Sequence, residues 1–132
     1  MLFQWPEMIE VLQNYKPTLH YHLVSWKPPR VGWVTCNTNG ASKGNSGKSS
    51  YGYCIRDGNG DLIYAEAHNI GKATNMEAEV MALWKALHYC MENRYSQVQL
   101  ETDSLALKNM IRGCWRIRWE VIEKVEDIQQ VI

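Results

Sequence analysis

The sequence lacks a net charge, because 14 lysines and arginines balance 14 aspartates and glutamates among its 132 residues. Bulk electrostatics therefore gives no argument for nucleic acid or a membrane surface, and any such binding has to come from a local patch. The apolar runs are far shorter than the roughly 18 residues of a membrane span, and no signal peptide is visible. These absences predict a soluble intracellular protein, in the cytoplasm or nucleus, without membrane contact.

Cysteine and phenylalanine are also scarce. The four cysteines, at positions 36, 54, 90 and 114, form no CxxC pair and no tight cluster. This spacing predicts free, buried thiols in a reducing compartment rather than a metal site or a disulfide framework. Phenylalanine occurs once, against six tryptophans and seven tyrosines, whose polar tips favour contact with water or a partner.

Residues 1–30 differ in composition from the rest of the chain. They are rich in proline and aromatic side chains and have no clean hydrophobic period. Apart from a short helix that Pro6 would open, they predict an N-terminal arm or linker that Pro28 and Pro29 close. Residues 31–132 form the predicted domain, since the chain is long enough for one domain with a core of its own.

Alternating apolar and polar residues predict that the domain begins with three strands in an antiparallel meander. A long loop over 40–50, rich in glycine, serine and lysine, separates the first two strands, and the turn DGNGD separates the second and third. The predicted strands are 31–39, 51–56 and 62–70.

A long helix is predicted over 74–95, because Thr74 and Glu77 have the spacing of a capping box and apolar residues follow at helical spacing. The order β-β-β-α-β-α-α predicts an α/β protein with a mixed sheet, since a strand–helix–strand crossover pairs strands in parallel. The remaining predicted elements are a strand over 97–103 and helices over 105–112 and 119–132.

Three polar residues lie where the first strand, the fourth strand and the long helix are predicted to meet. Asn39 and Asp103 end the two strands, and the carboxyl ends of parallel neighbours lie at one edge of a sheet. Glu79 lies one turn into the helix, at the edge of its apolar face. Oxygen ligands from three elements would suit a hard cation. Each acid also has a structural interpretation: Glu79 favours the helix dipole, and Asp103 caps the next helix with Ser104 as a rival.

Three segments, in this order, resemble the sequence landmarks of ribonuclease H: the hairpin NTNGASKGNSG, the helix start TNMEAE and the strand end ETDS. The closer likeness is to ribonuclease H-like domains of the plant retroelement type, and it covers about residues 31–132. The resemblance implies a ribonuclease H-like fold with a mixed five-stranded sheet. It also implies Mg²⁺-dependent hydrolysis of the RNA strand in an RNA–DNA hybrid.

The resemblance implies roles for individual residues as well. Glu79 and Asp103 match two catalytic, metal-binding carboxylates of the family, and Asn39 stands where the family has its first catalytic aspartate. Met76 falls where many members have an amide that reads the minor groove, and a methionine cannot make those hydrogen bonds. The residues expected at the nucleic acid are Gly40, Ser42, Lys43, Asn45, Thr74, Asn75, Met76 and Ser104.

Asn39 is the first departure from the family pattern. An asparagine keeps one oxygen that can touch a metal, but it loses the charge and the second ligand oxygen. Mg²⁺ loses its water reluctantly, and two closely spaced ions need anionic ligands between them. We therefore expect Asn39 to prevent or severely weaken catalysis and to leave Mg²⁺ weakly bound or unbound. The same amide would also relieve repulsion among crowded carboxylates and so stabilise the fold.

The second departure is that the chain stops at Ile132, before the fifth strand and the fourth active-site acid that the resemblance implies. We expect the strand over 97–103 to have an unpaired edge, which invites another chain. A homodimer, or a strand donated from elsewhere such as the aromatic N-terminal arm, would cover that edge.

Basic and aromatic residues alternate in CWRIRW, a pattern that suits nucleic acid through phosphate contacts and stacking, although the same tryptophans would also suit a packed helix junction. The four histidines show no metal-ligand spacing and no obvious carboxylate partner.

Three hypotheses remain open. The chain is a domain that binds RNA–DNA hybrid or another duplex with lost or impaired nuclease activity, an active Mg²⁺-dependent hybrid endonuclease, or a protein-interaction module that uses the exposed sheet edge.

Overall fold

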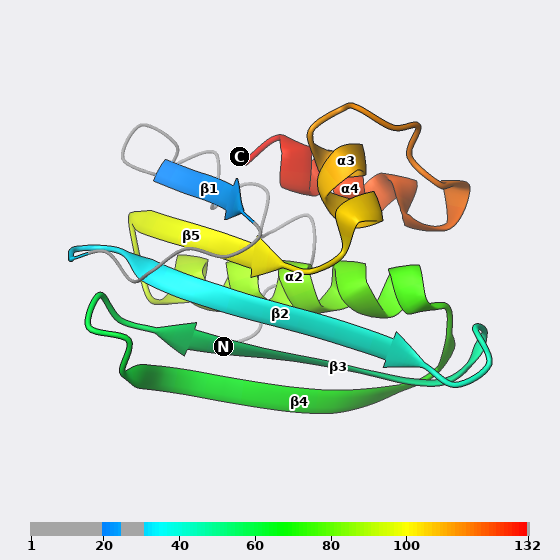
Figure 1. Cartoon of the computed structure of the whole chain (residues 1–132), viewed down its shortest axis with the longest axis horizontal. Helices are drawn as coiled ribbons and strands as arrows, with labels where there is room; N and C mark the ends of the chain where they lie inside the picture. Colours follow the sequence, from blue (N-terminus) through cyan, green and yellow to red (C-terminus); the bar gives the residue numbers. More distant parts are fainter. Residues whose placement is uncertain (1–19, 25–30, 132) are drawn as a thin grey trace.

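The computed structural model describes residues 20–24 and 31–131, which form a mixed sheet with a long helix across one of its faces (Figure 1). The sheet has five strands in the order β1-β5-β2-β3-β4. The strands are β1 His20–Val24, β2 Val34–Ser42, β3 Gly47–Arg56, β4 Leu62–Ala73 and β5 Gln97–Thr102.

The helices of the described residues follow the meander. In Figure 1 the long helix α2 lies behind β5 and β2, and the shorter helices lie near the β5 side of the sheet. No helix in this part of the chain is long and apolar enough to cross a membrane. The helices are α2 Asn75–Glu92, α3 Leu105–Ile111 and α4 Ile122–Gln129, and the 3-10 turn η2, Trp119–Val121, precedes α4.

From β2 to α4 the predicted order β-β-β-α-β-α-α and the mixed sheet are confirmed. β3 pairs antiparallel with both β2 and β4, whereas β5 pairs parallel with β2. This topology results from the crossover through α2, because a strand that returns after a helix enters the sheet in parallel. It places the carboxyl ends of β2 and β5 at the same edge of the sheet, where Thr38 is the register partner of Thr102.

The first hairpin differs from the prediction, because the loop expected over 40–50 is a tight turn between extended strands. β2 runs on to Ser42 and β3 resumes at Gly47. The reversal uses left-handed backbone at Gly44 (φ 72°) and Asn45 (φ 38°), and glycine and asparagine are the residues that tolerate this region best. Polar composition predicted a loop here, yet both strands continue because their backbone groups pair across the hairpin.

The edge of β5 is not open, so the expectation of an unpaired strand edge is wrong. β1 pairs parallel with β5, with His20 opposite Gln97 and Val24 opposite Glu101. The strand comes from the predicted N-terminal arm, so the proposal that the arm donates a strand to this edge is confirmed. It satisfies backbone groups that a bare edge would leave to water or to another chain. The predicted helix over 6–15 lies outside the described residues, and the domain boundary at residue 30 stays a prediction.

Helix α2 follows its predicted design. Thr74 is the N-cap and forms a full capping box with Glu77, so two backbone donors of the first turn are satisfied. The predicted apolar stripe is buried against β2 and β3, with Leu83 and Leu87 at 0% and 1% exposure. Each such leucine contributes about 1.5–3 kcal/mol through burial.

The thiols follow the prediction in part. Cys36 on β2 and Cys90 on α2 are fully buried, with their Sγ atoms 3.3 Å apart, and Cys54 is partly buried. Cys114 is exposed, so the expectation of burial is wrong there. It lies in the loop after α3, where no strand or helix positions it against the core.

Candidate active site

Strand β2 and helix α2 approach each other unusually closely at Gly40. A Cβ atom at this position would lie 2.3 Å from the carbonyl carbon of Ala78 and 2.5 Å from the amide nitrogen of Glu79. No side chain fits into that space, so the backbone of β2 packs directly on the first turn of α2. Because Gly40 directly follows Asn39, this contact brings the helix carboxylate to the end of the strand.

The Glu79 carboxyl group lies near two potential donors, the backbone N–H of Gly40 on β2 and the hydroxyl of Ser104 at the start of α3. Its Oε2 atom is buried and has no hydrogen-bond partner among the described residues. Burial raises the pKa of Glu79, and the nearby charge of Asp103 adds to that effect, while the two donors oppose it by stabilising the charged form. The site therefore contains a half-buried acid with one uncompensated oxygen.

Glu79 and Asp103 lie in one pocket of about 420 Å³, as the sequence predicted for the helix and the end of β5. Asp103 itself is exposed at the end of β5. Ser104, not Asp103, caps α3 by accepting a hydrogen bond from Leu107 N–H, so the rival cap is the observed one. The pocket is lined by Gly40, Ala41, Asn75, Met76, Glu79, Asp103 and Ser104.

Asn39 lies next to this pocket rather than in its lining. Its side chain is exposed, and the residue lines a neighbouring pocket that shares Gly40 and Ala41 with the first one. Asn39 is the register partner of Gly52 on β3. The Asn39 side chain is therefore exposed to solvent. It lies one residue before Gly40, where β2 packs on the first turn of α2 and approaches Glu79.

The predicted nucleic-acid-binding residues of the hairpin and the helix start hold each other in place. Asn75 Oδ1 accepts from Ser42 N–H at 2.7 Å, and Asn75 N–H donates to Asn45 Oδ1 at 2.8 Å. Ser42 Oγ donates to Ala73 C=O at 2.7 Å. These contacts fix the β2–β3 turn on the N-terminus of α2, where backbone N–H groups and the helix dipole favour an anion.

Two further predicted residues differ in their exposure. Met76 lines the pocket but is only 6% exposed and belongs to the apolar core, so little of its side chain is available to a ligand. Lys43 is exposed at the β2–β3 turn. Whether these residues contact nucleic acid stays a prediction.

The residues of this pocket fit one divalent ion bound through oxygen. The orphaned Oε2 of Glu79 and the nearby carboxylate of Asp103 are the hard, anionic ligands that Mg²⁺ prefers. Among the described residues no group of three or more histidine, cysteine, aspartate or glutamate side chains is placed to hold a metal. With an amide at Asn39, the donor set does not fit a pair of closely spaced ions.

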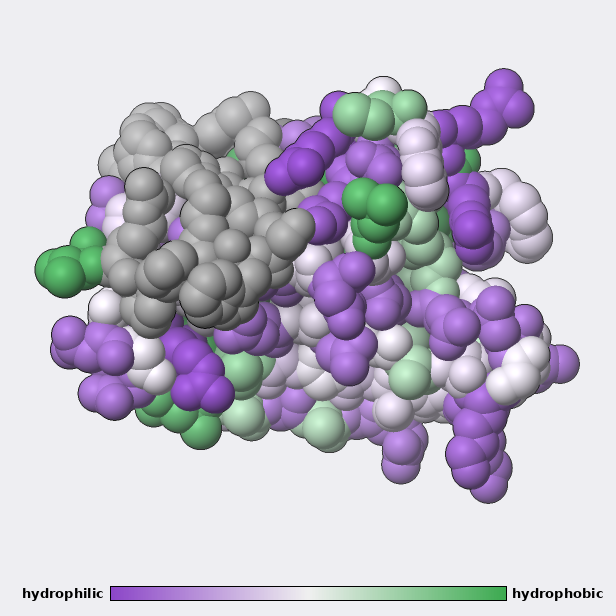
Figure 2. Space-filling view, in the orientation of Figure 1, coloured by the Kyte–Doolittle hydropathy of each residue, from purple (hydrophilic) through white to green (hydrophobic). Residues whose placement is uncertain are grey.

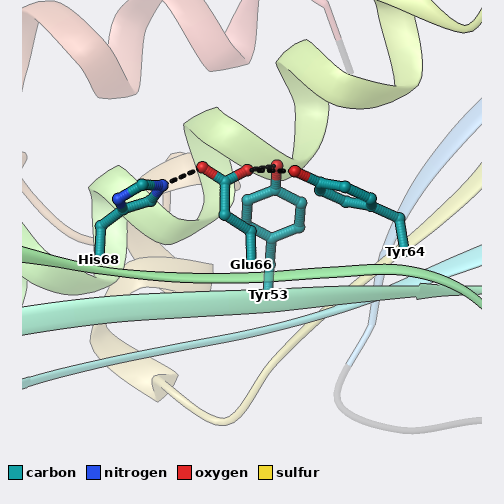
Figure 3. A network of polar contacts seen from close by, with 4 residues as sticks. All are labelled: Tyr53, Tyr64, Glu66 and His68. Atoms are coloured by element: carbon teal, nitrogen blue, oxygen red, sulfur yellow. Dashed lines mark hydrogen bonds and ion pairs between the residues drawn. The ribbon is translucent and has the colours of Figure 1, made fainter.

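Sequence reasoning missed a second polar cluster, which lies on β3 and β4 beside α2 (Figure 3). The Glu66 carboxylate accepts hydrogen bonds from Tyr53 at 2.5 Å, from Tyr64 at 3.2 Å and from His68. Burial alone would raise the pKa of Glu66, but these donors outweigh it and hold the pKa below its ordinary value. The i, i+2 spacing of Tyr64, Glu66 and His68 on one strand face was the available signal.

The fold and the pocket define a class of protein: a mixed sheet with one covering helix, and acids from the helix and from the end of a central strand. Solved structures of ribonuclease H1 share this fold. The enzyme from Halobacterium salinarum aligns with a TM-score of 0.70 and 27% identity over 75% of this chain and 76% of that one. LC11-RNase H1 in complex with RNA/DNA hybrid aligns with a TM-score of 0.68 and 24% identity over 74% and 75%.

Sequence comparisons agree with the structural ones. Residues 37–132 match the family described as "Reverse transcriptase-like", and the chain belongs to this family. It is 34% identical over 90 residues to a protein of Arabidopsis thaliana named as a ribonuclease H protein, and 33% identical over 105 residues to ribonuclease HI of Halobacterium salinarum. These alignments cover 68% and 80% of this chain, but the chain spans only 14% and 52% of the two relatives.

Proposed function

We propose that the chain binds RNA–DNA hybrids and that its nuclease activity is lost or strongly impaired. The observation that carries the proposal is the pocket in which Gly40 brings Glu79 against β2 beside Asp103, with an amide at Asn39. The binding surface would consist of the β2–β3 turn and the N-terminus of α2, which hydrogen bonds hold together. The family, the ribonuclease H relatives and a structural neighbour that was solved with RNA/DNA hybrid support this substrate class.

Glu79 and Asp103 would hold a divalent ion, with Asn39 as a weak neutral neighbour. When bound, such an ion polarises a phosphate oxygen and lowers the pKa of a bound water. The protein itself places Glu79 beside Gly40 N–H and Ser104, and its helix start would offer N–H groups to the backbone phosphates. We propose a plant retroelement-type origin with the function; the similarity to a ribonuclease H protein of Arabidopsis thaliana supports the plant part of that proposal.

The test compares the protein with Asn39→Asp for cleavage and binding of a labelled RNA–DNA hybrid in Mg²⁺. We expect both proteins to bind the hybrid and only Asn39→Asp to cleave it, since the added carboxylate supplies the missing charge. Asn59→Asp, which adds the same charge in the exposed β3–β4 turn, is the matched control and should not cleave. Cleavage by the unchanged protein would refute impaired activity, and absence of hybrid binding would refute the proposal itself.

The active endonuclease remains the second candidate, because Glu79 and Asp103 are both in place. The cleavage assay separates the two, since the active endonuclease has to cleave the hybrid in Mg²⁺ without any substitution, whereas Mg²⁺ binding alone fits both. The third hypothesis, an interaction module at the open edge of β5, loses its basis because β1 occupies that edge, and we propose no homodimer through it.

A further inference from the structure

The end of the molecule beyond the candidate active site carries an exposed tryptophan in a cleft. Trp119, at the start of η2, is 85% exposed, although a ring of this size normally buries most of its area. It lines a cleft of about 490 Å³ between η2, the β2–β3 turn and the start of α2. The cleft is lined by Ser46, Lys72, Ala73, Thr74, Glu77, Trp119 and Glu120.

The chemistry of this cleft fits a nucleobase better than a second protein or an apolar ligand. An exposed indole ring offers a flat stacking surface, and any base has a π-face to stack on it. Lys72 and Ser46 supply donors, while Glu77 and Glu120 supply carboxylate acceptors for the polar edge of a base. One aromatic wall with donors and acceptors around it is the arrangement by which proteins hold an unstacked base.

Charge around the cleft suits the phosphates on either side of such a base. Lys43, Lys48 and Lys72 lie exposed at the hairpin end, and Arg116 and Arg118 lie exposed in the loop 112–118 that leads to Trp119. Figure 2 shows hydrophilic side chains projecting at the end of the molecule where Figure 1 places this turn and this loop. Exposed lysines and arginines arranged in this way can contact successive phosphates of a nucleic acid, even though the whole chain has no net charge.

The base in the cleft has to be unpaired. Within a duplex both faces of each base are covered by its neighbours, so an indole ring can stack only on a terminal or single-stranded base. Thr74 lines the cleft and also caps α2, so the cleft continues directly from the proposed hybrid-binding surface. We infer that the Trp119 cleft takes an unpaired nucleotide next to a bound duplex, so that the chain prefers a junction between duplex and single strand. This inference rests on the proposed function.

The test measures binding of labelled oligonucleotides to the full chain by fluorescence anisotropy. The probes are a blunt RNA–DNA hybrid, the same hybrid with a short single-stranded extension on either strand and at either end, and the single strand alone. We expect at least one extension to tighten binding about tenfold, the scale of one base stacked on an aromatic side chain. An abasic site at the first unpaired position keeps the phosphate and should remove most of the gain.

Substitutions test whether the preference for the single-stranded extension comes from the Trp119 cleft. Trp119→Ala should abolish the preference for the extension and leave blunt-hybrid affinity unchanged, whereas Trp119→Phe should keep most of the preference. Trp115→Ala is the matched control, because Trp115 is 50% exposed in the same loop but does not line the cleft. Equal loss in Trp115→Ala and Trp119→Ala would overturn the assignment of the cleft.

The failure of this inference is distinguishable from that of the proposed function. Equal affinity for blunt and extended hybrids would overturn the junction preference while hybrid binding stands. If no hybrid binds but the single strand does, and Trp119→Ala abolishes that binding, the cleft is confirmed as a base site and the proposed function fails. Absence of binding to every probe overturns both.

Discussion

The contact between Gly40 and α2 predicts that this glycine cannot be replaced even by alanine. The added Cβ would lie 2.3 Å from the carbonyl carbon of Ala78, whereas ordinary contacts begin at 3.4 Å. The atoms that the Cβ would meet belong to the backbone of Ala78 and Glu79, and the position of a Cβ atom is fixed by its own backbone, so no side-chain rotation relieves the clash. Helix α2 would have to retreat from β2 by about 1 Å, which breaks the packing that positions Glu79.

Overpacking of a core typically costs about 1–3 kcal/mol, and we expect Gly40→Ala to lose about 3 kcal/mol because neither side can yield locally. A domain of this size has about 5–15 kcal/mol of stability, so the variant should fold but unfold at clearly lower urea concentration. Equilibrium unfolding in urea, followed by circular dichroism, measures the difference directly.

Gly52→Ala is the matched control on the neighbouring strand. Its Cβ would lie 3.4 Å from the carbonyl oxygen of Glu66 and 3.7 Å from the Cβ of Ala67, and we expect a change within about 0.5 kcal/mol. If Gly40→Ala is as stable as the unchanged protein, or if both alanines cost the same, the reasoning about the close approach is wrong.

Three further predictions concern titrating side chains and thiols. Glu66→Gln should lose about 1–3 kcal/mol in urea unfolding at pH 7, because its donors lose a charged acceptor. The folded-state pKa of Glu66 lies below its ordinary 4.5, so this contribution is present above that pH and the loss should shrink as the pH falls through the folded-state value. Glu79→Gln should be more stable than the unchanged protein at pH 7 without divalent ions, by at most about 1 kcal/mol after solvent screening. Burial raises the pKa of Glu79 in the folded protein, so ionisation of Glu79 lowers the free energy of unfolding as the pH rises. Equal free energies of unfolding for Glu79→Gln and the unchanged protein at pH 7 would contradict that shift. A thiol reagent should label Cys114 in the folded protein, while Cys36 and Cys90 react only after unfolding; mass spectrometry of the peptides checks this order.

Short-range sequence patterns predicted the features that depend on residues of a single segment. The capping box of Thr74 and Glu77 and the apolar stripe of α2 both belong to one helical segment, and the structure shows both. The meeting of Glu79 with Asp103 was also predictable, because one crossover and one parallel pair suffice to place them.

Patterns that depend on distant segments were harder to interpret. Nothing around His20–Val24 alternates clearly, and the strand forms where β5 offers an edge more than 70 residues further along the chain. The sequence did not identify Glu66 as the partner of His68, although the two are only two residues apart. Their contact depends on which face of β4 lies toward Tyr53. The Gly40 contact needs the helix position, which no short segment encodes.

The pairing of β1 with β5 has a consequence for the order in which parts of the fold open. Strand β5 is held on one side by β2 at the centre of the sheet and on the other by β1, an edge strand of five residues whose one neighbour in the sheet is β5. An edge strand can separate while the rest of the sheet stays paired, whereas the pairing with β2 is part of the centre of the sheet and is lost with the core. Hydrogen exchange should therefore divide the amides of β5 into two alternating sets. Those facing β1 should exchange through a small local opening, and those facing β2 only when the whole domain unfolds.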